Sequence, residues 1–246
     1  ISTGARPTLE LEPRLVALVK RSFPDLPVFA YDTVDEERLL EFDGQVPVGS
    51  LGRHLRRSSE AFPAPKPYLR ADPDLTNALR QKYVERASGR KVIGVAWNSV
   101  NPKTGGRKSL PLEQWGSILS APDALFVSLQ YGDVEEAVAK ASEATGVTIL
   151  VDDDIDPITD FDAAASQVAA MDLVIATSNT AVHLAGALGK AVWVMVPAVP
   201  AWRWGLEGET APWYPNLRIF RQSKSGDWTS VIEEVTQALT EWHSQN

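Results

Sequence analysis

Residues 172–196, DLVIATSNTAVHLAGALGKAVWVMV, contain two apolar runs separated by a short segment rich in alanine and leucine. The two runs, Asp172–Ala176 and Ala191–Val196, are almost continuously apolar, which is typical of strands buried on both faces of a sheet. Between them, the pattern of Ala181–Leu188 predicts a helix. Residues 172–196 therefore predict a strand–helix–strand unit whose two strands are parallel.

The same alternation continues on both sides of this unit. We predict further strands at Lys91–Trp97, Ala124–Leu129, Val147–Val151 and Leu217–Phe220. We predict further helices at Pro111–Leu119, Val134–Ala144, Phe161–Ala170 and Trp228–Trp242. In the first of these helices, proline stands at the first helical position, where it is favoured. This order implies an α/β fold, with a Rossmann-like parallel sheet covered by helices on both faces.

The N-terminal third has a different pattern. It contains a predicted strand at 7–12, a helix at 14–23 and a strand at 27–31, followed by a polar stretch without a sustained period. Residues 62–74, FPAPKPYLRADPD, hold four prolines, which predicts an extended, stiff connector. This connector is either a surface loop or a domain boundary. We predict a partial N-terminal α/β lobe at 1–62, a connector and linking helix at 63–89, and a Rossmann-like domain at 90–246.

Composition excludes several classes of protein. The chain has 246 residues and a formal net charge of −8, which argues against a nucleic-acid partner because such binders present a basic stripe. No apolar run approaches the roughly 20 residues of a transmembrane helix, so we expect no transmembrane segment. The absence of cysteine excludes disulfides, thiolate nucleophiles and cysteine-based zinc sites. No secretory signal is visible, and we expect a cytoplasmic protein.

Ligands of open parallel sheets bind beyond the carboxyl ends of the strands, so the loops there are the candidate sites. Four polar residues follow the strand that ends at Ala176: Thr177, Ser178, Asn179 and Thr180. A helix begins here, and its free N–H groups and positive dipole end suit a phosphate. Plain N-capping is the alternative. His183, one turn inside this helix, is either close to such an anion or a packed residue.

Two other loops are charged. Residues 98–109 contain two glycines and three basic residues, which indicates a flexible anion-binding segment or a solvated loop. This loop matches neither the Walker A nor the dinucleotide-binding glycine pattern. Residues 152–156 contain four aspartates, but Pro157 and Ala163 stand where an EF-hand needs Gly and Glu. We therefore predict a solvated acidic loop and no metal site.

The last loop, Pro197–Pro215, is unusually long and rich in aromatic residues. Loops of this length inside a domain are functional or disordered, and its three tryptophans argue against disorder. Trp202 and Trp204 flank Arg203, so they either stack on a nucleobase or sugar or form a lid packed on the edge of the sheet.

Several of these segments resemble one family. SNTAVHLAGALGKAVWVMVP and PAWRWGLEGETAPWYPNLRIFRQ resemble the C-terminal half of bacterial glycosyltransferases related to the heptosyltransferases, in particular a group attached to tetratricopeptide repeats. Asn179, Thr180 and His183 lie at places comparable to that family's Asp/Asn-Thr/Ser-x-x-x-His hallmark, although the spacing differs slightly among members. IGVAWNSVNPKTGGRKSLP resembles its first C-domain strand and phosphate loop, FVSLQYG its second strand, and YLRADP its interdomain connector. The similarity covers 65–246 well and 7–60 more loosely.

The resemblance implies a GT-B architecture of two Rossmann-like lobes that transfers a sugar from a nucleotide-sugar donor to a hydroxyl on a protein or glycan. The donor is a substrate, and neither a metal nor another cofactor is expected; tetratricopeptide repeats are a possible N-terminal partner. The implied donor and phosphate contacts are Lys108, Arg107, Ser178, Asn179, Thr180 and His183. The implied base, ribose or sugar contacts are Gln130, Asp160, Asp162, Trp202, Arg203 and Trp204.

The sequence departs from the family in its N-terminal part. The family opens with a Gly-rich GxGD loop that holds the presumed acceptor-activating carboxylate, and no such motif precedes residue 90. The chain also begins with Ile1 rather than methionine, so we expect a fragment or a processed product that has part of the lobe. The catalytic base stays unassigned. We therefore keep three hypotheses: a glycosyltransferase, a non-catalytic nucleotide- or glycan-binding module of GT-B fold, and, less favoured, a sugar-nucleotide epimerase.

Overall fold

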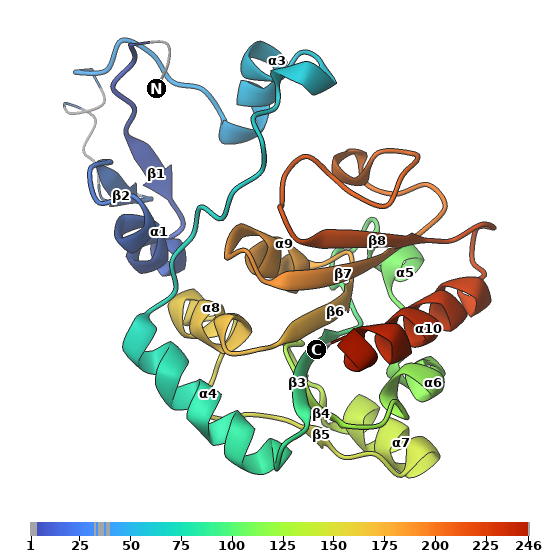
Figure 1. Ribbon diagram of the computed structural model, residues 1–246. Helices are drawn as coiled ribbons and strands as arrows, with labels where there is room; N and C mark the ends of the chain where they lie inside the picture. Colours follow the sequence, from blue (N-terminus) through green and yellow to red (C-terminus); the bar gives the residue numbers. More distant parts are fainter. Residues whose placement is uncertain (1–3, 32, 34–36, 38–39, 246) are drawn as a thin grey trace.

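Six parallel strands form the main sheet of the computed structural model, which describes residues 4–31, 33, 37 and 40–245. Along the sheet the order is β5–β4–β3–β6–β7–β8 (Figure 1). The strands are β3 (Lys91–Ala96), β4 (Ala124–Ser128), β5 (Ile149–Leu150), β6 (Leu173–Thr177), β7 (Ala191–Val196) and β8 (Leu217–Arg221). Each observed strand lies within a predicted strand or extends beyond it by one residue at one end. The predicted α/β fold with a Rossmann-like parallel sheet is confirmed.

Helices cover both faces of this sheet (Figure 1). One face is covered by α4 (Pro73–Ala87), α8 (Phe161–Ala169) and α9 (Thr180–Ala187). The other is covered by α6 (Gly116–Leu119), α7 (Glu135–Thr145) and α10 (Thr229–Gln245). Alternate strand residues enter the two cores: Val174 packs toward α9, whereas Ile175 packs toward α10. This explains why the strands are apolar at successive positions.

A second, smaller sheet lies in the N-terminal part. It consists of two paired parallel strands, β1 (Leu9–Leu11) and β2 (Val28–Ala30). The chain between them forms a 3-10 helix, η1 (Pro13–Leu15), and α1 (Val16–Ser22). These elements match the predicted segments. The polar stretch that follows contains η2 (Val48–Ser50), α3 (Leu51–Leu55) and η3 (Ser59–Ala61), none of which the sequence predicted. Residues 32, 34–36 and 38–39 of that stretch lie outside the described residues. The predicted domain limits stay a prediction.

The proline-rich connector is extended, as predicted, and is packed on the main domain. Backbone N–H groups of Tyr68 and Leu69 both donate to the carbonyl oxygen of Ala187, at 2.9 and 3.0 Å. Pro67 lies against Gly189, where a Cβ would be 2.4 Å from the proline ring. The connector is therefore attached to the C-terminal end of α9.

Three local predictions were wrong. Pro111 is the N-cap and not the first helical residue, because its ψ of 136° is extended, and the helix begins as a 3-10 turn, η4 (Leu112–Trp115). Strand β5 has only two residues, because it lies at the sheet edge and pairs with β4 alone. The loop at 98–109 contains a short helix, α5 (Gly105–Lys108), which was not predicted.

The strand order creates one special position. From β3 the chain builds outward through β4 to β5, and then returns to place β6 on the other side of β3. The loops that leave β3 and β6 therefore diverge, and crevices at such a topological switch point are where open α/β sheets bind ligands. Within the described part of the chain, no helix has the length and apolar character needed to span a membrane.

Candidate functional site

Asn179 lies at the switch point and joins its two loops. Its side-chain oxygen accepts a hydrogen bond from the N–H of Ala181 (3.1 Å), which caps α9, and its amide donates to the carbonyl oxygen of Asn98 (3.2 Å) in the loop after β3. Asn179 is only 5% exposed, whereas Thr180, the first helical residue, is exposed. Asn179 is therefore the N-cap of α9. It fixes the N-terminus of α9 beside the β3 loop.

Trp204, in the 3-10 helix η5 (Trp202–Trp204), packs against the start of α9. Its indole N–H donates to the hydroxyl of Ser178 at 2.8 Å, and its ring stacks on His183 with centroids 5.1 Å apart and planes 6° from parallel. Arg221 of β8 holds the same turn by donating to the carbonyl oxygen of Trp204 (3.0 Å). Trp204 is therefore packed inside, with no free ring face to present to a ligand at His183.

His183 is largely buried and uncharged at neutral pH. Nδ1 of its ring lies 2.9 Å from the hydroxyl of Tyr214. Burial, together with the positive charges of Arg203 and Lys108, lowers the pKa of His183 to about 4. His183 is thus a packed residue that nevertheless lies close to two cationic side chains.

Lys108 and Arg203 form the cationic part of the site. Lys108 ends α5 in the β3 loop, and Arg203 belongs to η5 in the β7 loop. Burial lowers the pKa of Lys108, and the charge of Arg203 lowers it further. Among the described residues neither side chain has a carboxylate partner. Two mutually repelling cations beside a helix N-terminus are arranged to bind an anion. Arg107 is exposed on the same turn.

Hydrogen bonds within the β3 loop give it a defined turn, and its flexibility stays a prediction. The Asn101 side chain accepts hydrogen bonds from the N–H groups of Lys103 and Thr104 (3.0 and 3.1 Å). A Cβ at Gly105 would be 2.1 Å from the carbonyl oxygen of Ser99, so this glycine permits close backbone approach. Gly105 thus permits a tight helical turn that ends at Lys108.

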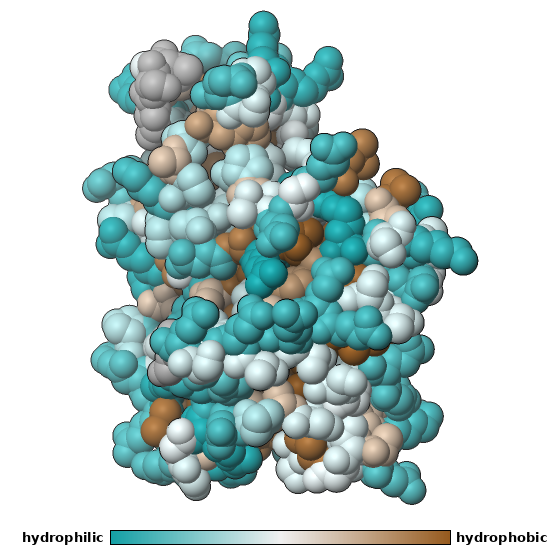
Figure 2. Space-filling model, turned by 45° about the vertical axis from the view of Figure 1, so that its right-hand side comes forward, coloured by the Kyte–Doolittle hydropathy of each residue, from teal (hydrophilic) through white to brown (hydrophobic). Residues whose placement is uncertain are grey.

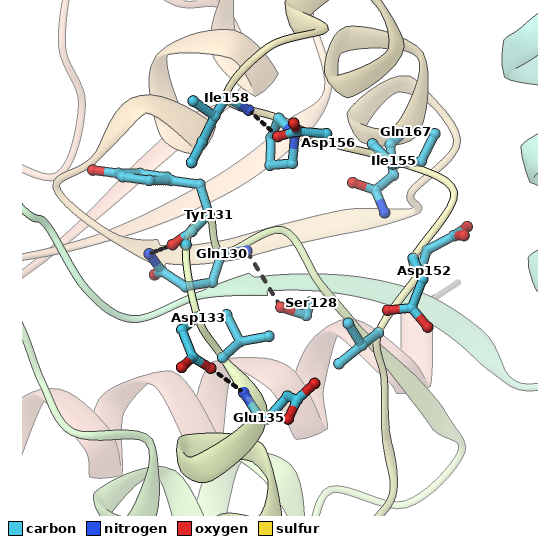
Figure 3. A pocket seen from close by; sticks show the side chains of 15 residues that line it. Ser128, Gln130, Tyr131, Asp133, Glu135, Asp152, Ile155, Asp156, Ile158 and Gln167 are labelled. Carbon is cyan, nitrogen blue, oxygen red and sulfur yellow. Dashed lines mark hydrogen bonds between the residues drawn. The ribbon is translucent and has the colours of Figure 1, made fainter.

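A cavity of about 470 Å³ lies beyond the carboxyl ends of β4 and β5 (Figure 3). Five carboxylate residues line it: Asp133, Glu135, Asp152, Asp153 and Asp156. No lysine or arginine belongs to its lining. Gln130 also lines it, and its side-chain oxygen accepts hydrogen bonds from the N–H groups of Trp97 (3.1 Å) and Asn98 (2.8 Å). Gln130 therefore connects this acidic cavity to the β3 loop and the cationic site.

The acidic loop is only partly solvated, which corrects the prediction. Asp152 is buried, at 7% exposure, and accepts hydrogen bonds from Lys82 (2.7 Å) and Tyr83 (2.6 Å) of α4. Burial opposes ionisation of Asp152, but these two hydrogen bonds outweigh it and lower the pKa of the carboxyl group. Asp153 and Asp154 are exposed, as expected. Across the described residues, no group of three or more His, Cys, Asp or Glu side chains is arranged to hold a metal ion.

Asp160 and Asp162, which the resemblance places near a ribose, have protein partners. Asp160 caps α8 by accepting from the N–H of Ala163 (2.8 Å). Asp162 forms a two-pronged ion pair with Arg21 of α1, at 2.5 and 2.6 Å. Neither has a hydrogen bond or ion pair with Lys108, Arg203 or His183. The structure therefore does not bring these two carboxylates into the cationic site.

The two interpretations of the aromatic loop apply to different tryptophans. Trp204 is packed, but Trp202 is 68% exposed, and the Arg203 guanidinium lies 5.1 Å from the centre of its ring. Trp213 makes edge-to-face contacts with two rings. Its ring centroid lies 5.6 Å from that of Trp202 and 4.8 Å from that of Phe62 in the N-terminal part. Elsewhere the face shown in Figure 2 is mainly hydrophilic, and its apolar residues form small, separate groups.

The parallel sheet with helices on both faces matches solved structures of glycosyltransferases, and this likeness shows that the chain has the GT-B fold. Among solved structures, ADP-heptose LPS heptosyltransferase II of Escherichia coli is 15% identical, with a TM-score of 0.51 over 96% of this chain and 76% of that one. A family 9 glycosyl transferase of Veillonella parvula is 9% identical, with a TM-score of 0.52 over 89% of this chain and 65% of that one. The predicted resemblance to heptosyltransferases is confirmed at the level of the fold.

One curated protein is similar in sequence. Protein FlbA of Caulobacter vibrioides is 34% identical over 247 residues, which cover 96% of this chain and 41% of that protein. The chain thus spans about two fifths of the length of this relative. No protein-family model matches the chain. The predicted association with tetratricopeptide repeats stays a prediction.

Proposed function

We propose that the protein is a glycosyltransferase that moves a sugar from a nucleotide-sugar donor to a hydroxyl of a protein or glycan. One observation carries this proposal: Lys108 and Arg203, two cations without carboxylate partners among the described residues, lie close to each other and to His183 in the first turns of α9. The fold shared with solved glycosyltransferases supports the same activity.

The proposed chemistry follows from charge. As the sugar leaves the nucleotide through an oxocarbenium-like transition state, negative charge grows on the departing phosphate. Fixed positive groups that already point at that position stabilise the transition state more than the ground state. Lys108, Arg203 and the dipole of α9 supply such groups, so we propose transfer that does not depend on a metal. The exposed Thr180 and Arg107 are proposed as further phosphate contacts.

The acidic cavity is proposed to hold the nucleoside. Carboxylates accept hydrogen bonds from hydroxyl and amino groups and repel phosphates. A nucleotide sugar placed with its phosphates at Lys108 and its ribose or base toward Asp133 and Asp156 matches both charge patterns. Gln130 lines the cavity and also holds the β3 loop, so the two ends of such a ligand would contact one connected site.

A binding module without turnover is the second candidate, because no residue is assigned as the base that activates the acceptor. A transfer and donor-hydrolysis assay on the full-length gene product distinguishes the two, with a panel of nucleotide sugars as donors. We expect turnover of at least one donor, and a loss of at least tenfold in Lys108→Ala. Nucleotide binding without any turnover would instead establish the binding module.

A further inference from the structure

A chain of hydrogen bonds leads from the connector to His183. The hydroxyl of Tyr214 lies 2.9 Å from Nδ1 of His183 and is also hydrogen-bonded to the hydroxyl of Tyr68. The two tyrosine rings stack, with centroids 6.5 Å apart and planes 21° from parallel. Tyr68 belongs to the connector, Tyr214 to the β7 loop and His183 to α9. The connector is therefore linked to His183 through Tyr214.

Gly186 provides the space for the central tyrosine. A Cβ at this position of α9 would lie 2.4 Å from the ring of Tyr214. Gly186 follows His183 by three residues, so the two lie on the same face of the helix. The absence of a side chain at Gly186 lets the tyrosine ring lie directly on α9, which brings its hydroxyl to Nδ1 of His183.

The chemistry of the two groups decides which one donates. A phenol O–H, with an ordinary pKa of about 10, is a much stronger acid than the N–H of a neutral imidazole. A neutral imidazole nitrogen is also a stronger acceptor than a phenol oxygen. Burial raises the pKa of Tyr214, which keeps its proton in place. Donation from the Tyr214 hydroxyl to Nδ1 of His183 is therefore the favoured direction, and it leaves Nε2 as the protonated nitrogen of the neutral ring.

We propose that Tyr214 is a positioning residue that holds His183 as the neutral tautomer protonated at Nε2, so that the imidazole presents an N–H donor to the anionic group of the ligand. The role toward the ligand rests on the proposed function. Stacking on Trp204 fixes the plane of the ring, and the hydrogen bond from Tyr214 to Nδ1 leaves Nε2 as the protonated nitrogen. The opposite tautomer would present a lone pair at Nε2, which repels phosphate oxygens.

The remaining groups around His183 are consistent with a neutral donor. Lys108 and Arg203 lower the pKa of His183, so a third full positive charge is disfavoured there. A neutral N–H adds a hydrogen bond without that cost. No carboxylate of the described residues forms a hydrogen bond or ion pair with His183, so none stabilises its protonated form.

Nitrogen-15 NMR of the histidine side chains in the ligand-free protein tests the tautomer directly. In the wild type we expect Nδ1 of His183 in the unprotonated range and Nε2 in the protonated range at pH 7. In Tyr214→Phe, both resonances should move toward the average of the two tautomers. Protonated Nδ1 in the wild type, or a Tyr214→Phe spectrum identical to the wild type, would overturn the inference.

A further variant, with two controls, tests the inference without removing the hydroxyl of Tyr214. Gly186→Ala displaces the ring of Tyr214 without removing its hydroxyl and should change the His183 resonances in the same direction. Gly52→Ala, in α3 with no atom near its Cβ, and Tyr31→Phe, on the exposed N-terminal part, should leave them unchanged. If Gly186→Ala leaves the His183 resonances unchanged as well, the seating of Tyr214 on α9 does not set the tautomer.

Titration with inorganic pyrophosphate separates this inference from the proposed function. We expect Tyr214→Phe to weaken pyrophosphate binding about five- to tenfold, the effect of one hydrogen bond. If the wild-type tautomer is as inferred but pyrophosphate does not bind, the proposed function fails and the tautomer assignment stands. If pyrophosphate binds but Nδ1 is protonated, the inference fails and the proposed function stands.

Discussion

Burial changes the charge of individual residues at the site. His183 has lost its ordinary titration near neutral pH because its ring is enclosed by Trp204 and Tyr214. Lys108 keeps its charge but lies beside Arg203 without a counter-ion, which costs stability in the free protein. Residues that are unfavourable for the fold and concentrated at one crevice are typical of functional sites.

The depressed pKa of His183 predicts a pH-dependent stability. The unfolded chain binds a proton at His183 below about pH 6.5, whereas the folded protein does so only near pH 4. The free energy of unfolding therefore falls as pH decreases through this window, with a contribution of about 2 kcal/mol at pH 5. Urea unfolding at pH 7 and pH 5 measures it.

Variants isolate the histidine from the other titrating groups. The loss of stability between pH 7 and pH 5 should be smaller by about 2 kcal/mol in His183→Gln than in the wild type. His54→Gln, at an exposed position of α3, is the matched control variant. Equal losses in His183→Gln and the wild type would show that His183 titrates normally in the folded protein.

At the scale of elements, α9 and α5 place the cationic site. Helix α9 has its N-terminus at the switch point and its C-terminal end under the connector. Helix α5 is a single turn closed on the β3 loop, and Gly105 is the residue that permits this closure. The position of Lys108 thus depends on a backbone contact three residues away.

Two neighbouring glycines in α5 allow a matched test of that dependence. Gly105→Ala introduces a Cβ 2.1 Å from the carbonyl oxygen of Ser99, whereas Gly106→Ala introduces one with no atom within 4 Å. We expect Gly105→Ala to displace Lys108 and weaken pyrophosphate binding at least fivefold, with little effect of Gly106→Ala. Calorimetric titration measures both. Equal binding by the two variants would mean that the α5 turn does not position the lysine.

At the scale of the whole molecule, the proposed ligand site of this acidic chain consists of two regions of opposite charge. The net charge is −8, yet cations from the β3 and β7 loops gather near α9, while carboxylates line the cavity at β4 and β5. A ligand with phosphates at one end and hydroxyl or amino groups at the other fits this division.

Much of the fold could be predicted from the sequence. The strands β3, β4, β6 and β7 are buried on both faces, so their residues are apolar at successive positions and the pattern is strong. The location of the candidate site was predicted from the rule for parallel sheets, which pointed to Asn179 and the β3 loop. In contrast, α3 has no buried residue, and its sequence accordingly shows no periodic signal.

The contacts inside the site could not be predicted, because tertiary packing creates them. The hydrogen bond between Trp204 and Ser178 joins residues 26 positions apart, and that between Tyr214 and His183 joins residues 31 apart. The partner of Asp162 is Arg21, 141 residues away. The only local signal for Tyr214 was its place in an aromatic loop, which indicated neither its hydroxyl partner nor Gly186 beneath its ring.

Calorimetric titration with a panel of nucleoside diphosphates tests the central claim, that the cations beside α9 form an anion site for a nucleotide donor. We predict that at least one nucleoside diphosphate binds the wild type. Lys108→Ala and His183→Ala should both weaken this binding, the former about tenfold or more. Lys20→Ala, which changes an exposed lysine on α1, should leave the binding unchanged. Failure of the whole panel to bind, or binding unaffected by Lys108→Ala and His183→Ala, would contradict the account.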